Sequence, residues 1–306
     1  QPLTDVTVDA NIRADSDPVL IAPDAGMDRI VGAAPALRVG TWNLQNFSRF
    51  GIDEFRFGDI RDLIAQLQPD ILALQEIKAA EAPWRDEGEA WDALVSQLDG
   101  YEGVRAEWRS QDTVVGLIYR TDRIEVIGAK ELFPTDSWSF PRAPLQVTVK
   151  ATADEGEAEF DVIVLHLKAY SDVESRSRRF QAVQKLHALL AERVDATALV
   201  LGDFNDSPHD PAEVNIFRGT FMDNASEYLF LTHLLPADTA TTVGWPEPGQ
   251  RDDAPGEFLD HAVMTDDLLG IYPGAYAEVF NREPSYFTWW EQTYSDHFPV
   301  FVYLQR

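Results

Sequence analysis

The sequence contains no cysteine in its 306 residues. This absence excludes disulfide bonds, thiolate metal sites and a cysteine nucleophile. Lysine is also scarce: five lysines and 20 arginines stand against 52 acidic residues, and the formal net charge is −27 at pH 7. Such a surface repels polyanions at long range and attracts multivalent cations, which argues against tight binding of nucleic acid through a broad basic surface. Solubility or adaptation to salt also explains an acidic composition of this kind.

Long apolar runs are absent as well. No stretch of about 18 or more apolar residues occurs, so we expect no membrane-spanning helix. The sequence begins Gln1-Pro2-Leu3, without a methionine, a basic segment or an apolar segment. We therefore expect an exported, extracellular bacterial protein whose leader has been removed. No feature of the sequence points to an obligate protein partner.

The composition of the sequence changes near residue 37. Residues 1–36 are rich in Asp, Ala and Pro, and we interpret them as an acidic N-terminal extension without a core of its own. Residues 37–306 are predicted to form one folded domain. Residues 238–257, rich in Thr, Pro, Gly and Asp, are predicted to be its longest loop.

Strands and helices are both predicted in this domain, without strict alternation. Apolar residues at a spacing of three and four predict a helix over Asp53–Leu67, and similar patterns predict helices near residues 89–98 and 173–193. Alternating or continuous apolar runs predict strands over residues 37–42, 71–74, 101–108, 113–119, 124–133, 145–151, 160–166, 198–201, 259–264 and 298–304. This pattern favours an α/β (α+β) fold with two packed sheets covered by helices.

Polar side chains recur at the ends of these apolar strands. Each strand is a rigid mount, and its end exposes a side chain at the rim of a sheet, where functional sites are commonly built. Taken singly, each of these residues has an ordinary explanation as a turn former or a salt-bridge partner. Their repetition favours one shared metal and phosphate site. The residues are Asn43, Glu76, His166, Asp203, Asn205, Asp260, Asp296 and His297.

The residue types indicate what such a site could do. Glu76 is a hard oxygen ligand of the kind that Mg²⁺, Mn²⁺ and Ca²⁺ prefer. Asp203 and Asn205 are two residues apart and point to the same side of an extended chain, and Asp203 could remove a proton from water. Asp260 could accept the imidazole proton of His297, which would favour the charged ring.

Other polar and aromatic residues leave their interpretation open. Arg176, Arg178 and Arg179 could hold a phosphate backbone or pair with nearby acids. The Trp289-Trp290 pair could stack on a substrate or pack internally. The remaining histidines in helical or loop-like segments, His187, His209 and His233, are not assigned to the site.

Seven short segments together resemble the endonuclease/exonuclease/phosphatase superfamily. This superfamily includes deoxyribonucleases of the pancreatic type, apurinic endonucleases, neutral sphingomyelinases and inositol-phosphate phosphatases. Each segment alone is a modest signal, but their order along the chain is specific. They are Thr41-Trp42-Asn43, Leu74-Gln75-Glu76, Pro141-Arg142-Ala143-Pro144, Leu165-His166-Leu167-Lys168, Gly202-Asp203-Phe204-Asn205, Leu259-Asp260-His261 and Ser295-Asp296-His297.

The resemblance implies a four-layer α/β sandwich with two central mixed sheets flanked by helices, and a catalytic domain over residues 37–306. It implies that Glu76 binds a divalent metal, Mg²⁺ or else Mn²⁺ or Ca²⁺, with help from Asn43 and Asp296. Arg142 and Asn43 would contact the phosphate of the substrate. The residues implied to hold the phosphate and activate water are His166, Asp203, Asn205, Asp260 and His297.

The substrate stays open between hypotheses. The first is a nuclease without sequence specificity that hydrolyses DNA or RNA, as secreted bacterial members of the superfamily do. The second keeps the chemistry and changes the substrate to a phospholipid, sphingomyelin or a small phosphoester. The third is a binding protein that keeps the fold but not catalysis, which the presence of all the implied site residues disfavours.

Overall fold

The computed structural model describes residues 37–48, 53–78, 88–110, 112–152, 157–193, 196–244, 256–280 and 287–306. All of them belong to one unit of the chain, residues 34–306. The predicted extension over residues 1–36 lies outside the described residues, as does the middle of the predicted loop, residues 245–255.

The strands form two sheets of six. The first sheet has the order β11-β12-β1-β2-β4-β3, and the second has the order β5-β6-β7-β8-β10-β9. In the first sheet the strands are β1 (Leu37–Phe47), β2 (Ile71–Lys78), β3 (Tyr101–Arg105), β4 (Thr113–Arg120), β11 (Tyr276–Val279) and β12 (Val300–Leu304). In the second they are β5 (Ile124–Glu131), β6 (Leu145–Ala151), β7 (Ala158–His166), β8 (Ala198–Asp203), β9 (Tyr228–Phe230) and β10 (Asp260–Thr265).

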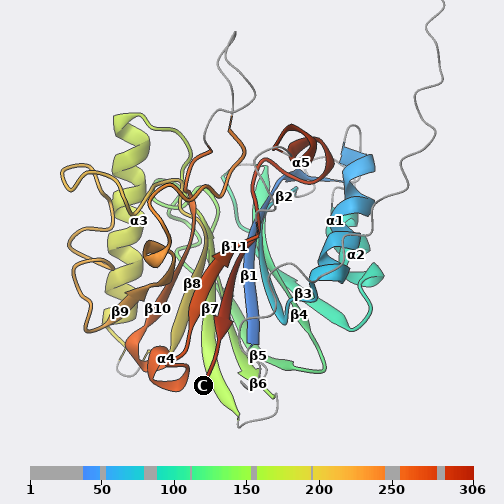
Figure 1. The fold of residues 1–306 in the computed structure, drawn as a ribbon, viewed down its shortest axis with the longest axis horizontal. Coiled ribbons are helices and arrows are strands. Elements are labelled where there is room, and N and C mark those ends of the chain that lie inside the picture. Colours follow the sequence, from blue (N-terminus) through green and yellow to red (C-terminus); the bar gives the residue numbers. More distant parts are fainter. Residues whose placement is uncertain are drawn as a thin grey trace, which may run out of the picture. The chain divides into compact units, whose positions relative to one another are not determined.

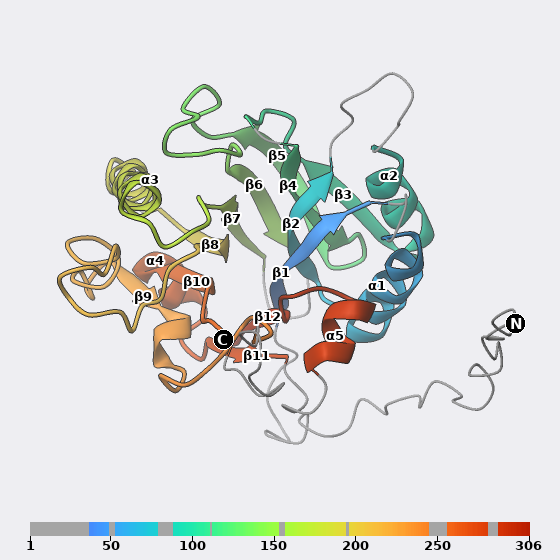
Figure 2. The same ribbon diagram turned by 90° about the horizontal axis from the view of Figure 1, so that it is seen from above.

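Helices cover the outer faces of the two sheets. Figure 2 shows α3 beside the second sheet and α1 and α2 beside the first, with both sheets between them. The predicted four-layer α/β sandwich is therefore confirmed. The helices are α1 (Asp53–Leu67), α2 (Gly88–Gln97), α3 (Val173–Ala191), α4 (Asp266–Ile271) and α5 (Phe287–Thr293), with a 3₁₀ turn at Leu231–Leu234. Among the described helices, none is long and apolar enough to cross a membrane.

The inner strands contain long apolar runs, such as Val162–Leu165 of β7, because both of their faces are buried. In β7, Val162 and Val164 pack into the core between the sheets. Ile163 and Leu165 pack on the opposite face, with the residues of α3. Alternate residues of the strand thus pack into two different cores, one between the sheets and one under the helix.

Each sheet contains one parallel pair of strands at its centre. β1 pairs in parallel with β2, and β7 pairs in parallel with β8. A helix connects the two strands of each pair, α1 in the first sheet and α3 in the second (Figure 1). Because parallel strands end on the same side, each pair delivers two C-terminal ends to one edge of its sheet, where ligand sites of α/β proteins form.

The predicted elements agree in type with the observed ones, and the boundaries differ by a few residues. The helix predicted over Asp53–Leu67 is α1 without change. The first strand extends beyond its predicted end to Phe47. The short elements α4, α5, β9 and β11 were not predicted, because segments of three to seven residues carry too few positions to show a period.

Candidate active site

The parallel strand pairs bring four of the predicted site residues together. Asn43 and Glu76 come from β1 and β2 of the first sheet, and His166 and Asp203 end β7 and β8 of the second. The Nδ2 atom of Asn43 donates to Glu76 Oε1 at 3.2 Å and to Asp203 Oδ2 at 3.0 Å. One buried amide therefore joins the two sheets at this edge.

A bulge in β2 aims the side chain of Glu76. The pairing of β2 with β4 shifts register between Leu74 and Ile77, and Glu76 adopts a φ of 59°. A non-glycine residue in this conformation is strained and persists only when its surroundings hold it. The backbone N–H of Asn46 donates to Glu76 Oε2 at 2.8 Å and helps to hold it. Asn46 lies in a second bulge, in β1, with a φ of 58°.

A glycine lets β7 and β8 approach each other just before His166 and Asp203. Gly202 has a φ of 147°, and a Cβ atom there would lie 2.0 Å from the carbonyl oxygen of Leu165. Only glycine fits this position. Beyond the strand, Asn205 has a φ of 54° and donates its side-chain amide to Leu167 O at 3.2 Å, while its backbone N–H donates to Asp203 Oδ1 at 2.8 Å. The loops after β7 and β8 are thereby tied together.

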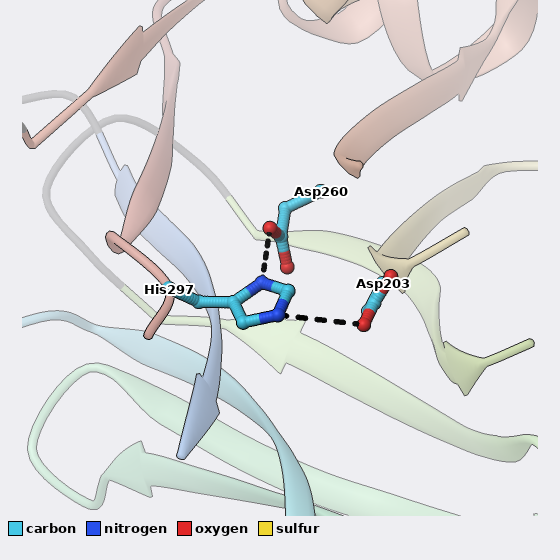
Figure 3. Close-up of side chains that lie close together, drawn as sticks. All are labelled: Asp203, Asp260 and His297. Atoms are coloured by element: carbon cyan, nitrogen blue, oxygen red, sulfur yellow. Dashed lines mark hydrogen bonds and ion pairs between the residues drawn. The ribbon is translucent and has the colours of Figure 1, made fainter. Parts of the chain in front are cut away.

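His297 lies between two buried carboxylates (Figure 3). Its Nδ1 atom is 2.7 Å from Asp260 Oδ2, and its Nε2 atom is 3.9 Å from Asp203 Oδ2. The indole N–H groups of Trp42 and Trp290 both donate to the carbonyl oxygen of His297, at 3.0 and 2.9 Å. The backbone of His297 is therefore fixed by two indoles and its ring by one carboxylate, which orients Nε2 toward the site.

Burial and charge set opposite protonation states for groups in this site. Burial alone would lower the pKa of His297, but the negative charges of Asp260, Asp203 and Asp296 raise it well above its ordinary value. Burial raises the pKa of Asp203 to about 7, with Asp260 adding to the rise and His297 opposing it. At neutral pH the site thus holds a cationic imidazole beside a carboxyl group that can still take up a proton.

His166 behaves differently from His297. Burial lowers its pKa well below the ordinary value, and the positive charges of Arg142 and His297 lower it further. Its Nε2 atom is 3.5 Å from Asp203 Oδ2. Arg142, whose Nε atom donates to Thr113 Oγ1 at 3.1 Å, has its own pKa lowered by burial against the opposing charges of Glu76 and Asp203. The site therefore contains a neutral imidazole close to Asp203 and a guanidinium whose charge acts on Glu76 and Asp203.

Two sets of side chains offer donors for a divalent cation. Asp203, Asp260 and His297 place ligand atoms within 4.8 Å of one another, but Nδ1 of His297 already pairs with Asp260. The set predicted from sequence, Glu76, Asp296 and Asn43, supplies hard oxygen atoms. Burial raises the pKa of Asp296, the negative charge of Glu76 raises it further, and the positive charge of His297 opposes the rise. The carboxylates of Asp296 and Glu76 therefore repel each other. A divalent cation would relieve that repulsion, and the donors therefore fit one.

Comparison with known families agrees with this geometry. The sequence matches the Endonuclease/Exonuclease/phosphatase family over residues 40–297, which includes every predicted site residue. The chain belongs to this family. It is a metal-dependent phosphoric ester hydrolase, as the members of this family are. A search of curated proteins found no match.

Solved structures share the fold of this phosphoesterase at low sequence identity. A humanized TDP2 of D. rerio has a TM-score of 0.63 and 16% identity, over 88% of this chain and 99% of that one. D. rerio TDP2 complexed with a single-strand DNA product has a TM-score of 0.58 and 15% identity, over 87% and 98%. The mannosyl-6-phosphatase of Bacteroides thetaiotaomicron has a TM-score of 0.56 and 18% identity, over 87% and 98%.

Several residues that build the site of the phosphoesterase were not predicted. Thr241 Oγ1 accepts hydrogen bonds from the backbone N–H groups of Leu259 and Asp260, at 3.0 and 3.1 Å. Ser295 Oγ donates to the carbonyl oxygen of Asn43 at 2.6 Å and accepts from the N–H of His297 at 3.1 Å. A threonine in a polar loop gives no sequence signal, whereas Ser295 stands inside a recognised motif and could have been found.

The basic cluster on α3 separates into two roles. Arg179 is buried and pairs with Asp206, Nε to Oδ2 at 2.8 Å, and also donates to the carbonyl oxygens of Lys168 and Tyr170. Arg178 donates to the carbonyl oxygens of Ser137 and Trp138. Arg179 thus joins the loops that follow β7 and β8 and stabilises the ends of the strands that carry His166 and Asp203. Arg178 instead holds the segment around Trp138.

The other histidines contact each other or aromatic rings, and Trp290 supports the site through the hydrogen bond that its indole donates to His297. His187 packs against the rings of Phe221 and Tyr228. The rings of His209 and His233 lie 4.8 Å apart. Trp290 packs against Trp42 and Phe298 and is buried, whereas the side chain of Trp289 lies outside the described residues.

Proposed function

We propose that this enzyme is a phosphodiesterase that hydrolyses DNA or RNA without sequence specificity, with Mg²⁺ as its metal and Mn²⁺ or Ca²⁺ as substitutes. One observation carries the phosphodiesterase assignment. A carboxyl group whose pKa is about 7, Asp203, lies 3.9 Å from the Nε2 atom of a histidine whose pKa is raised, His297. A base and a cation at this spacing suit attack of water on phosphorus.

The proposed reaction uses these groups as follows. Asp203 accepts a proton from water as the water oxygen forms a bond to phosphorus. The bond from phosphorus to the leaving oxygen breaks on the opposite side, and that oxygen takes up a proton from solvent. The imidazolium of His297 and the guanidinium of Arg142 stabilise the negative charge on the other phosphate oxygens. A divalent cation at Glu76 and Asp296, when bound, supplies further positive charge to those oxygens.

Asp260 and Asn43 act on the groups that carry out this reaction. Asp260 accepts the Nδ1 proton of His297 at 2.7 Å and keeps the ring charged and oriented. Asn43 fixes Glu76 relative to Asp203 through its two hydrogen bonds. Asn205 holds the loop that carries Asp203, and His166, neutral and 3.5 Å from Asp203, is placed to donate a hydrogen bond to a phosphate oxygen.

The nucleic-acid substrate is supported by one relative and opposed by another. TDP2 shares the fold and is known in complex with a single-strand DNA product. The mannosyl-6-phosphatase shares the fold to a similar degree, so a small phosphomonoester is the second candidate, alongside a phospholipid.

Cleavage assays separate these candidates. The protein is incubated with plasmid DNA, RNA, bis-p-nitrophenyl phosphate, p-nitrophenyl phosphate and sphingomyelin, each with Mg²⁺ or with EDTA. We expect hydrolysis of the polynucleotides and of the diester, and none in EDTA. Hydrolysis of p-nitrophenyl phosphate or sphingomyelin with intact DNA and RNA would refute the nuclease proposal. Asp99→Asn, at an exposed position, is the matched control for Asp203→Asn and is expected to keep full activity.

A further inference from the structure

Two solvent-exposed aromatic rings each carry a cation on one face. Tyr170 is 74% exposed, and the Nζ atom of Lys168 lies 4.3 Å from the centre of its ring. Trp138 is 45% exposed, and the guanidinium carbon of Arg178 lies 5.1 Å from its ring. Single exposed rings are ordinary on protein surfaces, whereas a ring with a cation on its face offers both a stacking surface and a positive charge. Their pairing with lysine and arginine is notable in a chain with five lysines and a net charge of −27.

The backbone beside both rings is held by arginines of α3. Arg178 donates to the carbonyl oxygens of Trp138 and Ser137 at 2.7 and 2.9 Å. Arg179 donates to the carbonyl oxygen of Tyr170 at 2.6 Å. Tyr170 itself has a φ of 81°, a strained conformation for a residue other than glycine. The backbone that carries each ring is therefore held by an arginine of α3, and at Tyr170 it is held in a strained conformation.

The two rings adjoin the candidate active site. Lys168 follows His166 by two residues, and its pKa is lowered by burial and then by the positive charges of Arg178 and Arg142. Burial lowers the pKa of Arg142, and the charges of Glu76, Asp203 and Tyr170 oppose that fall. Arg178 and Arg179 are neighbours in α3 and donate to the carbonyl oxygens of Trp138 and Tyr170, so the segments that carry the two rings meet at the start of this helix, just after the strand that ends in His166. This set of Trp138, Arg142, Lys168, Tyr170 and Arg178 is the aromatic–cation rim.

We propose that the aromatic–cation rim binds single-stranded nucleic acid, with unpaired bases stacked on Tyr170 and Trp138 and the adjacent phosphates facing Lys168, Arg178 and Arg142. This inference rests on the proposed phosphodiesterase function and narrows its substrate. Stacking on an aromatic ring suits every base and requires no sequence. It also depends little on salt and on net charge, so it can supply affinity where an acidic surface weakens the attraction for phosphates. The bases of a duplex are not available for it.

A lipid surface is the competing occupant, because Val173 and Phe180 of α3 are also exposed. An anionic membrane would meet the same repulsion from the net charge of −27 as a polyanion does, without a gain from stacking. Insertion into lipid needs apolar bulk, whereas stacking needs a flat ring. Leucine keeps the first property and removes the second, so leucine variants separate the two occupants.

Binding in EDTA tests the rim without turnover. A fluorescein-labelled oligothymidylate of about 12 nucleotides is titrated with the full chain, and anisotropy gives the Kd. We expect Tyr170→Leu and Trp138→Leu each to raise the Kd by about tenfold, and Tyr170→Trp to preserve it. Tyr276→Leu is the matched control, since Tyr276 is 40% exposed in β11 and stacks on Tyr303 instead. Its Kd should equal that of the unmodified protein.

Two outcomes would overturn the proposal. One is a Kd for the oligonucleotide that does not change in either leucine variant when thermal unfolding shows that both are folded. The other is binding to phosphatidylserine–phosphatidylcholine vesicles that the leucine variants retain, with no binding of the oligonucleotide. The nuclease proposal is judged separately in Mg²⁺. If the oligonucleotide binds in a way that depends on Tyr170 but is not cleaved, the nuclease proposal is refuted and the rim proposal stands. If cleavage is the same in Tyr170→Leu as in the unmodified protein, the rim proposal is refuted and the nuclease proposal stands.

Discussion

The two central sheets share one plan and carry different chemistry. Each has a parallel strand pair connected by a helix, and each sends two C-terminal strand ends to the same edge. The first sheet supplies Asn43 and Glu76, which offer oxygen and amide groups. The second supplies His166 and Asp203, to which the proposed mechanism assigns hydrogen-bond donation and proton transfer. In the mechanism that we propose, one supersecondary unit, used twice, places cation binding on one sheet and proton transfer on the other.

The sheets also differ in how they aim these side chains. The first uses bulges, with positive φ at Gln45, Asn46 and Glu76. The second uses a glycine, Gly202, that allows the backbone of β7 within contact distance. A bulge turns a side chain by inserting a residue, and a glycine permits a close approach by omitting one side chain. Both devices place strain or crowding at the site, where it is held by the surrounding hydrogen bonds.

The largest effect is expected when the second sheet loses Asp203, the proposed proton acceptor. Asp203→Asn keeps the shape of the side chain and one of the two hydrogen bonds that it accepts, from Asn43 or from Asn205, but cannot accept a proton from water. We expect kcat for bis-p-nitrophenyl phosphate to fall by about 1,000-fold, a typical loss for general-base catalysis. Steady-state kinetics with saturating Mg²⁺ measure it. A fall of less than about tenfold would remove Asp203 from the role of base.

The next effect concerns the close approach of β7 and β8. Gly202→Ala would place a Cβ atom 2.0 Å from Leu165 O in a backbone conformation that alanine rarely adopts. We expect a loss of about 3 kcal/mol in the free energy of unfolding. Gly128→Ala is the matched control, because a Cβ atom there meets nothing within 4 Å. Urea unfolding of both variants decides the matter, and equal stabilities would contradict the structural account of this motif.

Neither the glycine nor the bulges were predicted from the sequence as devices that aim side chains, but the glycine lies in a motif that the sequence shows. Gly202 stands inside a motif whose order with Asp203 and Asn205 is visible in the sequence, and β7 and β8 show as apolar runs. The bulge at Glu76 leaves no comparable trace, since Leu74-Gln75-Glu76-Ile77 would also suit a regular strand. Register shifts arise from pairing with β1 and β4, and pairing partners are not encoded by local periodicity.

Residues that act through long-range contacts were the hardest to foresee. The buried pair of Arg179 and Asp206 joins α3 to the loop after β8, and either residue alone looks like a surface charge in a chain with 52 acids. Thr241 is similarly unremarkable in sequence, and it supports Asp260 from a loop 19 residues away. Motif order predicts which residues meet, whereas the supports behind them depend on packing that only the fold supplies.

A smaller effect is expected on the Mg²⁺ dependence of activity, which variants of the two sheets should change differently. Glu76→Gln removes a negative oxygen from the proposed cation site, so we expect the Mg²⁺ concentration for half-maximal activity to rise by at least about tenfold. His166→Gln, on the other sheet, should lower activity without moving that concentration. Activity titrations with Mg²⁺ measure both midpoints. Equal shifts in the two variants would show that the sheets do not divide the chemistry in this way.

The smallest effect is a pH dependence of stability that belongs to the second sheet. Burial raises the pKa of Asp203 from 3.8 to about 7, so the folded protein takes up a proton there at pH values where the unfolded chain does not. The stability linked to that proton is complete below pH 3.8 and is lost as pH rises toward about 7. Asp203→Asn cannot lose it, so in EDTA this variant should gain stability relative to the unmodified protein as pH rises through this range, by at most about 1.4 kcal/mol for each pH unit. His297 stays charged through this range because its pKa is raised. Urea unfolding across the range, with Asp99→Asn as control, measures the difference, and a gap that is the same at every pH would show that Asp203 titrates normally.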